Sequence, residues 1–190
     1  DEDSHSTRLL RAAVLSQVGT FLKDDAEVVA ECRRRFNGYE DDITLMPADI
    51  QATILQIVLQ NGGQAEYDQT MKMYMSTDDM QRKKIPLNVL GAVNDDKLKM
   101  ATLEFALRSD DVKLQDFFYP IGSVTSNLKG TEMAWKFLQD NFAEFMNKVA
   151  KANSHLFDAV IQFCLVRFMS LERAAEVEAF FQANPVPRNT

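Results

Sequence analysis

The chain has 190 residues and a formal net charge of −7, from 21 Lys and Arg against 28 Asp and Glu. This acidity argues against a nucleic-acid partner, because binding to phosphates needs a surplus of Lys and Arg, and it also disfavours an anionic membrane surface. Hydrophobic residues make up 46% and charged residues 26%, which is the balance of a globular protein and excludes a disordered one. We therefore expect no nucleic acid and no membrane among the partners.

Glycine and proline are scarce, with 7 Gly and 5 Pro. Sheets joined by tight turns use both residues, whereas helices exclude both from their interiors. The composition therefore favours an all-helical chain.

Two cysteines are too few for a disulfide framework, so a reducing compartment is the simpler interpretation. The chain opens with polar and acidic residues that lack the apolar core of a signal peptide. The longest mostly apolar stretch, residues 156–169, is too short to span a bilayer, which needs about 20 residues. These features predict a soluble, cytoplasmic protein.

In the first part of the chain, apolar residues recur at helical spacing. The first stripe consists of Leu10, Val14, Val18 and Phe21. The further helices that this spacing predicts cover residues 29–39, 47–59 and 67–74.

The next helix is predicted to begin with a capping box formed by Ser76 and Asp79. Pro86 lies inside this helix, so we expect a break or kink near Ile85. Residues 94–96 then cap a further helix, which ends near Ser109.

The last third begins with a short, irregular helix over residues 114–124 and a loop over 125–130. A clear seam follows, in which Trp135, Leu138, Phe142, Phe145 and Val149 repeat at intervals of 3, 4, 3 and 4. A helix near residues 155–168 is apolar around most of its circumference and should lie between two layers. The final helix begins at residue 170 and stops at 184–185.

Together these elements predict an all-α protein, an irregular α-α superhelix of about ten helices in the manner of HEAT or armadillo solenoids. Each helical hairpin would bury its apolar face against the next. No linker or composition shift divides the chain, so we expect a single helical-repeat domain over residues 1–190.

Motifs for catalysis or cofactor binding are missing. A hydrolytic zinc site needs three protein ligands, and the two histidines, His5 and His155, are far apart and lack the HExxH spacing. The sequence also has no GxGxxG, P-loop or GxSxG motif. We therefore assign no catalytic, metal or cofactor-binding residue to this chain.

The cysteines each have a functional and a structural interpretation. His155 and Cys164 are nine residues apart on one predicted helix and so lie on opposite faces, which excludes a thiolate–imidazolium pair and favours Cys164 as a core residue. Cys32 precedes residues 33–35, all arginine, and nearby cations lower the pKa of a thiol. Its place on the apolar stripe with Phe36 instead favours a packed thiol.

Pairs of aspartates recur at predicted helix starts and loops. The pairs are Asp24/Asp25, Asp41/Asp42, Asp78/Asp79, Asp95/Asp96 and Asp110/Asp111. None has the alternating ligands of an EF-hand loop, so helix capping is favoured over cation binding.

The least regular stretch is residues 117–126. Proline, glycine and small hydroxyl residues there could expose backbone groups to a ligand, and the candidates for lining a ligand cavity are Tyr119, Gly122, Ser123 and Ser126. The alternative is a kinked helix followed by a loop.

Several segments, in consistent order, resemble the C-terminal helical domain of the puromycin-sensitive-type zinc aminopeptidases, which are gluzincin metallopeptidases. The strongest is AWKFLQDNF at residues 134–142. The others are LLR at 9–11, RRRF at 33–36, VLGA at 89–92, LEFAL at 103–107, IGSV at 121–124, EAFF at 178–181 and NP at 184–185. The departures from the family pattern are Pro86, Phe142 in place of a tryptophan, and an end at Thr190 before the last helices of the family.

This resemblance implies a fragment of a larger enzyme. In the family, zinc and the catalytic motifs belong to a separate catalytic domain, and the helical domain covers the cavity in which peptides bind. The resemblance thus implies a non-catalytic domain whose partners are the catalytic domain of the parent chain and its peptide substrate. The alternative is a free-standing helical-repeat scaffold that binds protein partners, which solenoid architecture supports equally well.

Overall fold

The computed structural model describes residues 4–77, 79–149 and 155–186, and these contain helices, turns and loops but no strand. The all-α prediction is confirmed. The chain divides into two compact units, residues 1–99 and 100–190. The prediction that residues 1–190 act as a single domain stays a prediction.

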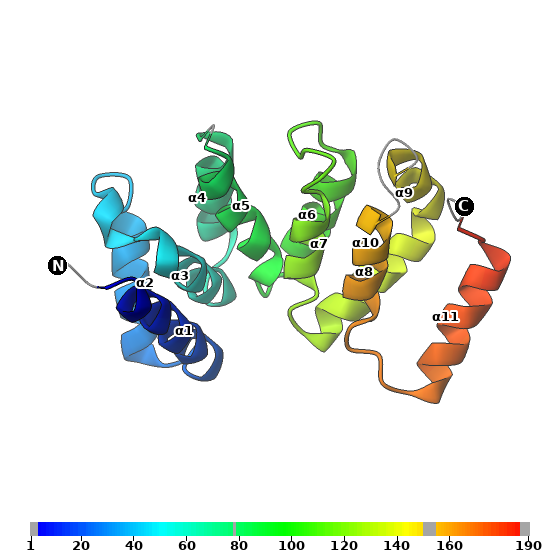
Figure 1. The fold of residues 1–190 in the computed structure, drawn as a ribbon, viewed down its shortest axis with the longest axis horizontal. Helices are drawn as coiled ribbons and strands as arrows, with labels where there is room; N and C mark the ends of the chain where they lie inside the picture. Colours follow the sequence, from blue (N-terminus) through cyan, green and yellow to red (C-terminus); the bar gives the residue numbers. More distant parts are fainter. Residues whose placement is uncertain (1–3, 78, 150–154, 187–190) are drawn as a thin grey trace. The chain divides into compact units, whose positions relative to one another are not determined.

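The first unit is built around α3. Its elements are α1 (His5–Phe21), α2 (Ala26–Gly38), the 3-10 helix η1 (Ile43–Leu45), α3 (Ala48–Gln60), α4 (Gln64–Met75), α5 (Met80–Val89) and the 3-10 helix η2 (Leu90–Ala92). Helix α3 contacts α1, α2, α4 and α5 (Figure 1). Because neighbours surround it, Leu55, Val58 and Leu59 are fully buried.

Three of the four residues of the apolar stripe of α1 are exposed, and only Val18 is half-buried. Leu10 is 66%, Val14 53% and Phe21 78% exposed. Helix α1 instead meets α3 on the side of Gly19, where an added Cβ would lie 2.7 Å from Cγ2 of Thr53. The missing side chain of Gly19 leaves room for the side chains of Thr53 and Ile57 of α3, so α1 packs on this side.

Aspartates cap several of the helices. Asp25 accepts hydrogen bonds from the backbone N–H groups of Glu27 and Val28 at the start of α2. Asp42 caps η1, and Asp95 caps α6 through Lys97 and Leu98. The capping explanation is confirmed for these aspartates. Asp78 lies outside the described residues.

Two predictions about α5 are wrong. Ser76 ends α4, and the backbone N–H of Arg82 donates to Asp79, so Asp79 itself caps α5 and the predicted capping box is not formed. The helix also runs through Pro86, so there is no break at Ile85. The alternative expectation, a kink at this point, stays a prediction. Packing of α5 against α3 and α4 outweighs the one backbone hydrogen bond that proline removes.

The second unit contains the rest of the chain. Its elements are α6 (Asp96–Arg108), whose residues from Met100 on belong to this unit, α7 (Phe118–Val124), α8 (Leu128–Asp140), α9 (Phe142–Val149), α10 (His155–Leu165) and α11 (Leu171–Ala183). Helix α10 packs against both α7 and α8. Its placement between two layers stays a prediction.

The seam of residues 135–149 is not one continuous helix. Helix α8 ends at Asp140 and α9 begins at Phe142. Between them, the side-chain amide of Asn141 donates to the carbonyl of Phe137 and so competes with continued helix formation. Trp135 and Phe145 are nevertheless buried in one core, so the apolar pattern holds although the helix is broken.

The sequence also misplaced the boundaries before this seam. Helix α7 is shorter than the predicted helix over residues 114–124 and runs through Pro120 and Gly122 without interruption. Helix α8 begins at Leu128, inside the predicted loop, because the side chain of Asn127 accepts the N–H of Gly130 at 2.8 Å and caps it.

The core of the second unit is centred on Trp135. Its indole packs edge-on to Phe180, with ring centroids 5.2 Å apart, and its Nε1 donates to Glu176 at 2.7 Å. Arg173 pairs with Glu176 and Glu132, both at 2.5 Å. The hydrogen bond from Trp135, followed by that from Arg173, lowers the pKa of Glu176 below its ordinary value of 4.5.

Replacing Gly130 by alanine should destabilise the second unit, although this change normally favours a helix. An added Cβ would lie 1.9 Å from the carbonyl oxygen of Val124, which is backbone and cannot turn away. We expect a loss of about 1–3 kcal/mol in the free energy of unfolding. Urea unfolding followed by the fluorescence of Trp135, the only tryptophan in the chain, measures it.

Lys136→Ala is the matched control on the same helix. Lys136 is exposed and its ion pair with Asp140 is a surface pair, so the change should stay within about 0.5 kcal/mol. A Gly130→Ala variant as stable as the wild type would contradict the contact with Val124.

The link between Trp135 and Glu176 should make stability depend on pH. The pKa of Glu176 is lower in the folded chain than in the unfolded chain. The ionised carboxylate therefore adds to the free energy of unfolding above the unfolded pKa, and this stabilisation is lost as the pH falls through the folded pKa. Glu176→Gln should therefore lose less stability than the wild type between about pH 5 and pH 3. The matched control is Glu178, whose carboxylate accepts a hydrogen bond from Gln182 on the same helix. Glu178→Gln should retain the wild-type dependence of stability on pH. Equal slopes for Glu176→Gln and the wild type would refute the coupling.

Candidate functional site

The histidine–cysteine pair cannot form a reactive centre. His155 stands at the start of α10 with 82% of its side chain exposed, whereas Cys164 near the end of that helix is 1% exposed. Burial raises the pKa of Cys164 to about 12. Cys164 is thus confirmed as a core residue. Among the described residues, no group of three or more His, Cys, Asp or Glu side chains could hold a metal ion.

Cys32 also has the environment of a packed thiol. It is 8% exposed, and burial, which outweighs the effect of Arg35, raises its pKa. The neighbouring arginines have other partners: Arg33 pairs with Glu66, and Arg34 and Arg35 both pair with Glu31. The cationic run therefore does not activate the thiol.

The native chain should accordingly react slowly with a disulfide thiol reagent at pH 8. Both thiols should react at least about tenfold more slowly than in the unfolded chain, because little thiolate is present and access is restricted. Absorbance of the released thiolate measures the rate, and the chain in denaturant provides the reference. Rapid labelling of Cys32 in the native chain would overturn this interpretation.

The four residues predicted to line a ligand cavity lie in and just after α7, where the chain itself occupies much of the space. An added Cβ at Gly122 would lie 3.0 Å from the ring of Phe163 on α10. Ser123 is buried and donates to the carbonyl of Pro120 at 2.6 Å, and the carbonyl of Ser126 accepts from Arg167 at 2.7 Å. Tyr119 is half-buried beside Phe118. Their lining of a substrate cavity stays a prediction.

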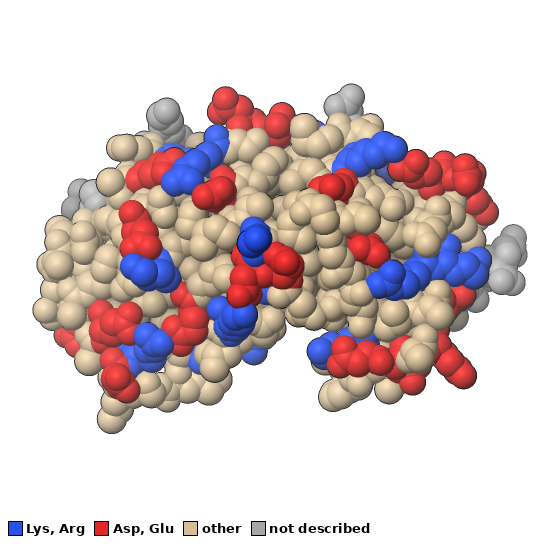
Figure 2. Space-filling model, turned by 180° about the vertical axis from the view of Figure 1, so that it is seen from behind, with Lys and Arg blue, Asp and Glu red and all other residues tan. Residues whose placement is uncertain are grey.

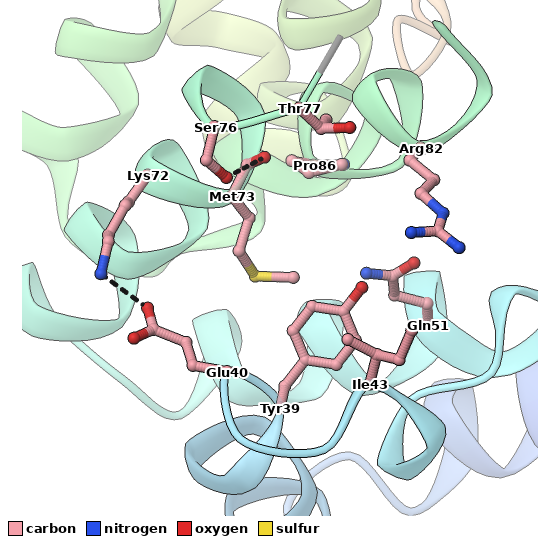
Figure 3. Close-up of a pocket in the computed structure, with 10 residues that line it drawn as sticks. All are labelled: Tyr39, Glu40, Ile43, Gln51, Lys72, Met73, Ser76, Thr77, Arg82 and Pro86. Carbon is pink, nitrogen blue, oxygen red and sulfur yellow. Dashed lines mark hydrogen bonds and ion pairs between the residues drawn. The ribbon is translucent and has the colours of Figure 1, made fainter. Parts of the chain in front are cut away.

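A cavity of about 370 Å³ lies elsewhere, within the first unit. It is bounded by the connection between α2 and α3, the start of α3, the end of α4 and the start of α5 (Figure 3). Lys72 on one side donates to Glu40 at 2.8 Å, and Arg82 stands on the other side. The hydroxyl of Tyr39 and the amide of Gln51 point into the space between them.

Sequence reasoning missed this cavity. Its polar residues come from four segments up to 43 positions apart, from Tyr39 to Arg82, and no short motif joins them. The one signal in the sequence was a glutamine, Gln51, within the predicted apolar helix over residues 47–59. The structure shows that this residue is only 4% exposed. Periodicity does not reveal that such a side chain faces a cavity.

A second cavity of about 350 Å³ lies between α1, α2 and α3 and is mostly apolar. Val18, Cys32 and Ile54 are among its lining residues, and Glu27, Glu31 and Arg35 supply its charges. Since Glu31 and Arg35 pair with each other, this cavity offers apolar surface and no assembled reactive group.

Charged side chains elsewhere are mixed in sign. On the face drawn in Figure 2, Lys and Arg side chains lie next to Asp and Glu side chains. Ion pairs of the chain include Arg108 with Glu144. Within the described residues, no helix is long and apolar enough to cross a bilayer.

These features define an all-helical domain whose described residues assemble no reactive centre, and the comparisons agree with that class. The family model described as "ERAP1-like C-terminal domain" matches residues 1–189. The chain belongs to this family.

Its relatives are aminopeptidases. The chain is 31% identical to "Aminopeptidase M1" of Arabidopsis thaliana over 190 residues, which cover 97% of this chain and 21% of that protein. It is 25% identical to "Puromycin-sensitive aminopeptidase" of Caenorhabditis elegans over 146 residues, 77% of this chain and 15% of that protein. The family resemblance drawn from the sequence is confirmed. The chain spans about a fifth of the length of the first of these relatives.

Proposed function

We propose that this chain is the non-catalytic C-terminal domain of a zinc-dependent aminopeptidase, in which it covers the active-site cavity and shapes the access of peptides. The observation that carries the proposal is the family match over residues 1–189 in a chain that offers no metal-ligand group among its described residues. The partners are the catalytic domain of the parent chain, which would hold the zinc, and the peptide substrate.

The first test assays the chain alone. Incubation of the 190-residue chain with aminoacyl-p-nitroanilides and added zinc should release no product above the protein-free blank. Zinc-dependent hydrolysis that a chelator abolishes would overturn the proposal. The reading frame upstream of Asp1 provides a second check, because an encoded HExxH motif supports a parent enzyme. A native start near Asp1 would favour a free-standing scaffold instead.

The second test examines peptide access in the parent enzyme. Tyr119, Gly122 and Ser126 are the half-buried members of the set predicted to line the cavity. Of these, Tyr119 and Ser126 have side chains that can meet a peptide more readily than the buried Ser123. Tyr119→Ala should raise KM for long peptides and leave the kinetics of a single aminoacyl-p-nitroanilide unchanged, because only the long substrate reaches this domain. Lys136→Ala, an exposed change elsewhere, should alter neither. Equal effects of Tyr119→Ala on both substrates would count against a role in access.

A further inference from the structure

The cavity of about 370 Å³, which is lined by Tyr39, Gln51 and Arg82, contains hydrogen-bond donors that the described part of the chain leaves unused. Gln51 is 4% exposed, and its amide makes no hydrogen bond to another described residue although it points into the cavity (Figure 3). A buried polar side chain without a partner costs free energy unless a ligand or water satisfies it. Because the amide reaches the cavity, either water or a polar group of a ligand can satisfy it there.

Arg82 supplies the positive charge for that group. The one ion pair found for its guanidinium joins it to Asp79 at 3.8 Å, a long contact between two largely exposed side chains. An exposed ion pair of this kind contributes little free energy and so holds the guanidinium only weakly. Lys72, by contrast, is engaged with Glu40 at 2.8 Å. Arg82 is thus the cation of the cavity whose planar donors remain available to an anion.

The rest of the lining limits the shape of that anion. Ile43, Met73 and Pro86 add apolar surface beside the polar groups, and the volume is about 370 Å³. A ligand that fits has a planar anionic end and an apolar body of roughly one amino-acid residue. A phosphate dianion fits less well, because one available cation and apolar walls replace little of its hydration.

We propose that this cavity binds an organic carboxylate with an apolar body. The guanidinium of Arg82 donates to the carboxylate, the amide nitrogen of Gln51 and the hydroxyl of Tyr39 supply further donors, and the apolar body lies against Met73 and Ile43. The carboxylate has two sources within one chemistry, the carboxyl terminus or an acidic side chain of a peptide. This inference rests on the first unit alone and does not depend on the proposed aminopeptidase role.

Calorimetric titration of the 190-residue chain tests the site with N-acetyl-leucine, which carries an α-carboxylate, and with N-acetyl-glutamic acid α-amide, which carries only a side-chain carboxylate. We expect saturable binding in the millimolar range for at least one of them, since ligands this small gain limited free energy. The compound that binds more tightly shows whether the site prefers a carboxyl terminus or an acidic side chain. N-acetyl-leucinamide, in which an amide replaces the carboxylate, should not saturate.

Variants then locate the binding. Arg82→Gln should weaken it at least about tenfold, because a charge-assisted hydrogen bond is lost. Gln51→Met, which keeps the volume and removes the donor, should weaken it several-fold. Arg34→Gln is the matched control, since the side chain of Arg34 is 57% exposed against 56% for Arg82 and lies outside the cavity. Circular dichroism confirms that each variant is folded.

Three results would overturn the proposal. They are no binding of either carboxylate, equal binding of N-acetyl-leucinamide, and undiminished binding by a folded Arg82→Gln variant. Inorganic phosphate is included as a further probe. Saturation by phosphate without saturation by either organic carboxylate would likewise refute the carboxylate assignment.

Discussion

Burial of one helix against several others is the constraint on which each unit depends. In the first unit, α3 is surrounded by α1, α2, α4 and α5. In the second, Trp135 of α8 joins an aromatic core with Phe180 and Phe181 of α11. Both arrangements need close approach at a position without a side chain. Gly19 lets α1 meet α3, and Gly130 lets α8 begin directly beside the carbonyl of Val124. Small residues therefore decide the packing as much as large ones do.

The same packing explains why the groups that could react do not. Aspartates such as Asp25 and Asp95 are occupied by the N–H groups of helix starts. The thiol of Cys164 is held in the core, where a thiolate is unfavourable. Gln51 of α3 and Arg82 of α5 instead line a cavity of the first unit. The described part of the chain therefore offers cavities between its helices.

The two proposals make use of different parts of the chain. Peptide access involves the surface around α7 in the second unit, where Tyr119 and Ser126 are half-buried. Carboxylate binding involves a cavity of the first unit, with its own donors and apolar walls. Because neither relies on residues of the other, each can hold or fail by itself. In each case helices of the same unit position the side chains concerned.

The sequence by itself determined the helical class, most helix positions, the aspartate caps and the family, because these depend on local periodicity, capping chemistry and ordered similarity. Only the tertiary structure decided that α1 turns most of its apolar stripe outward, that α5 continues through Pro86 and that the seam breaks at Asn141. It also decided that Gln51 and Arg82 share a cavity. Each of these features depends on which neighbour a helix packs against. The free energy of that packing comes from contacts between residues far apart in the chain, and the local sequence pattern does not reveal such contacts.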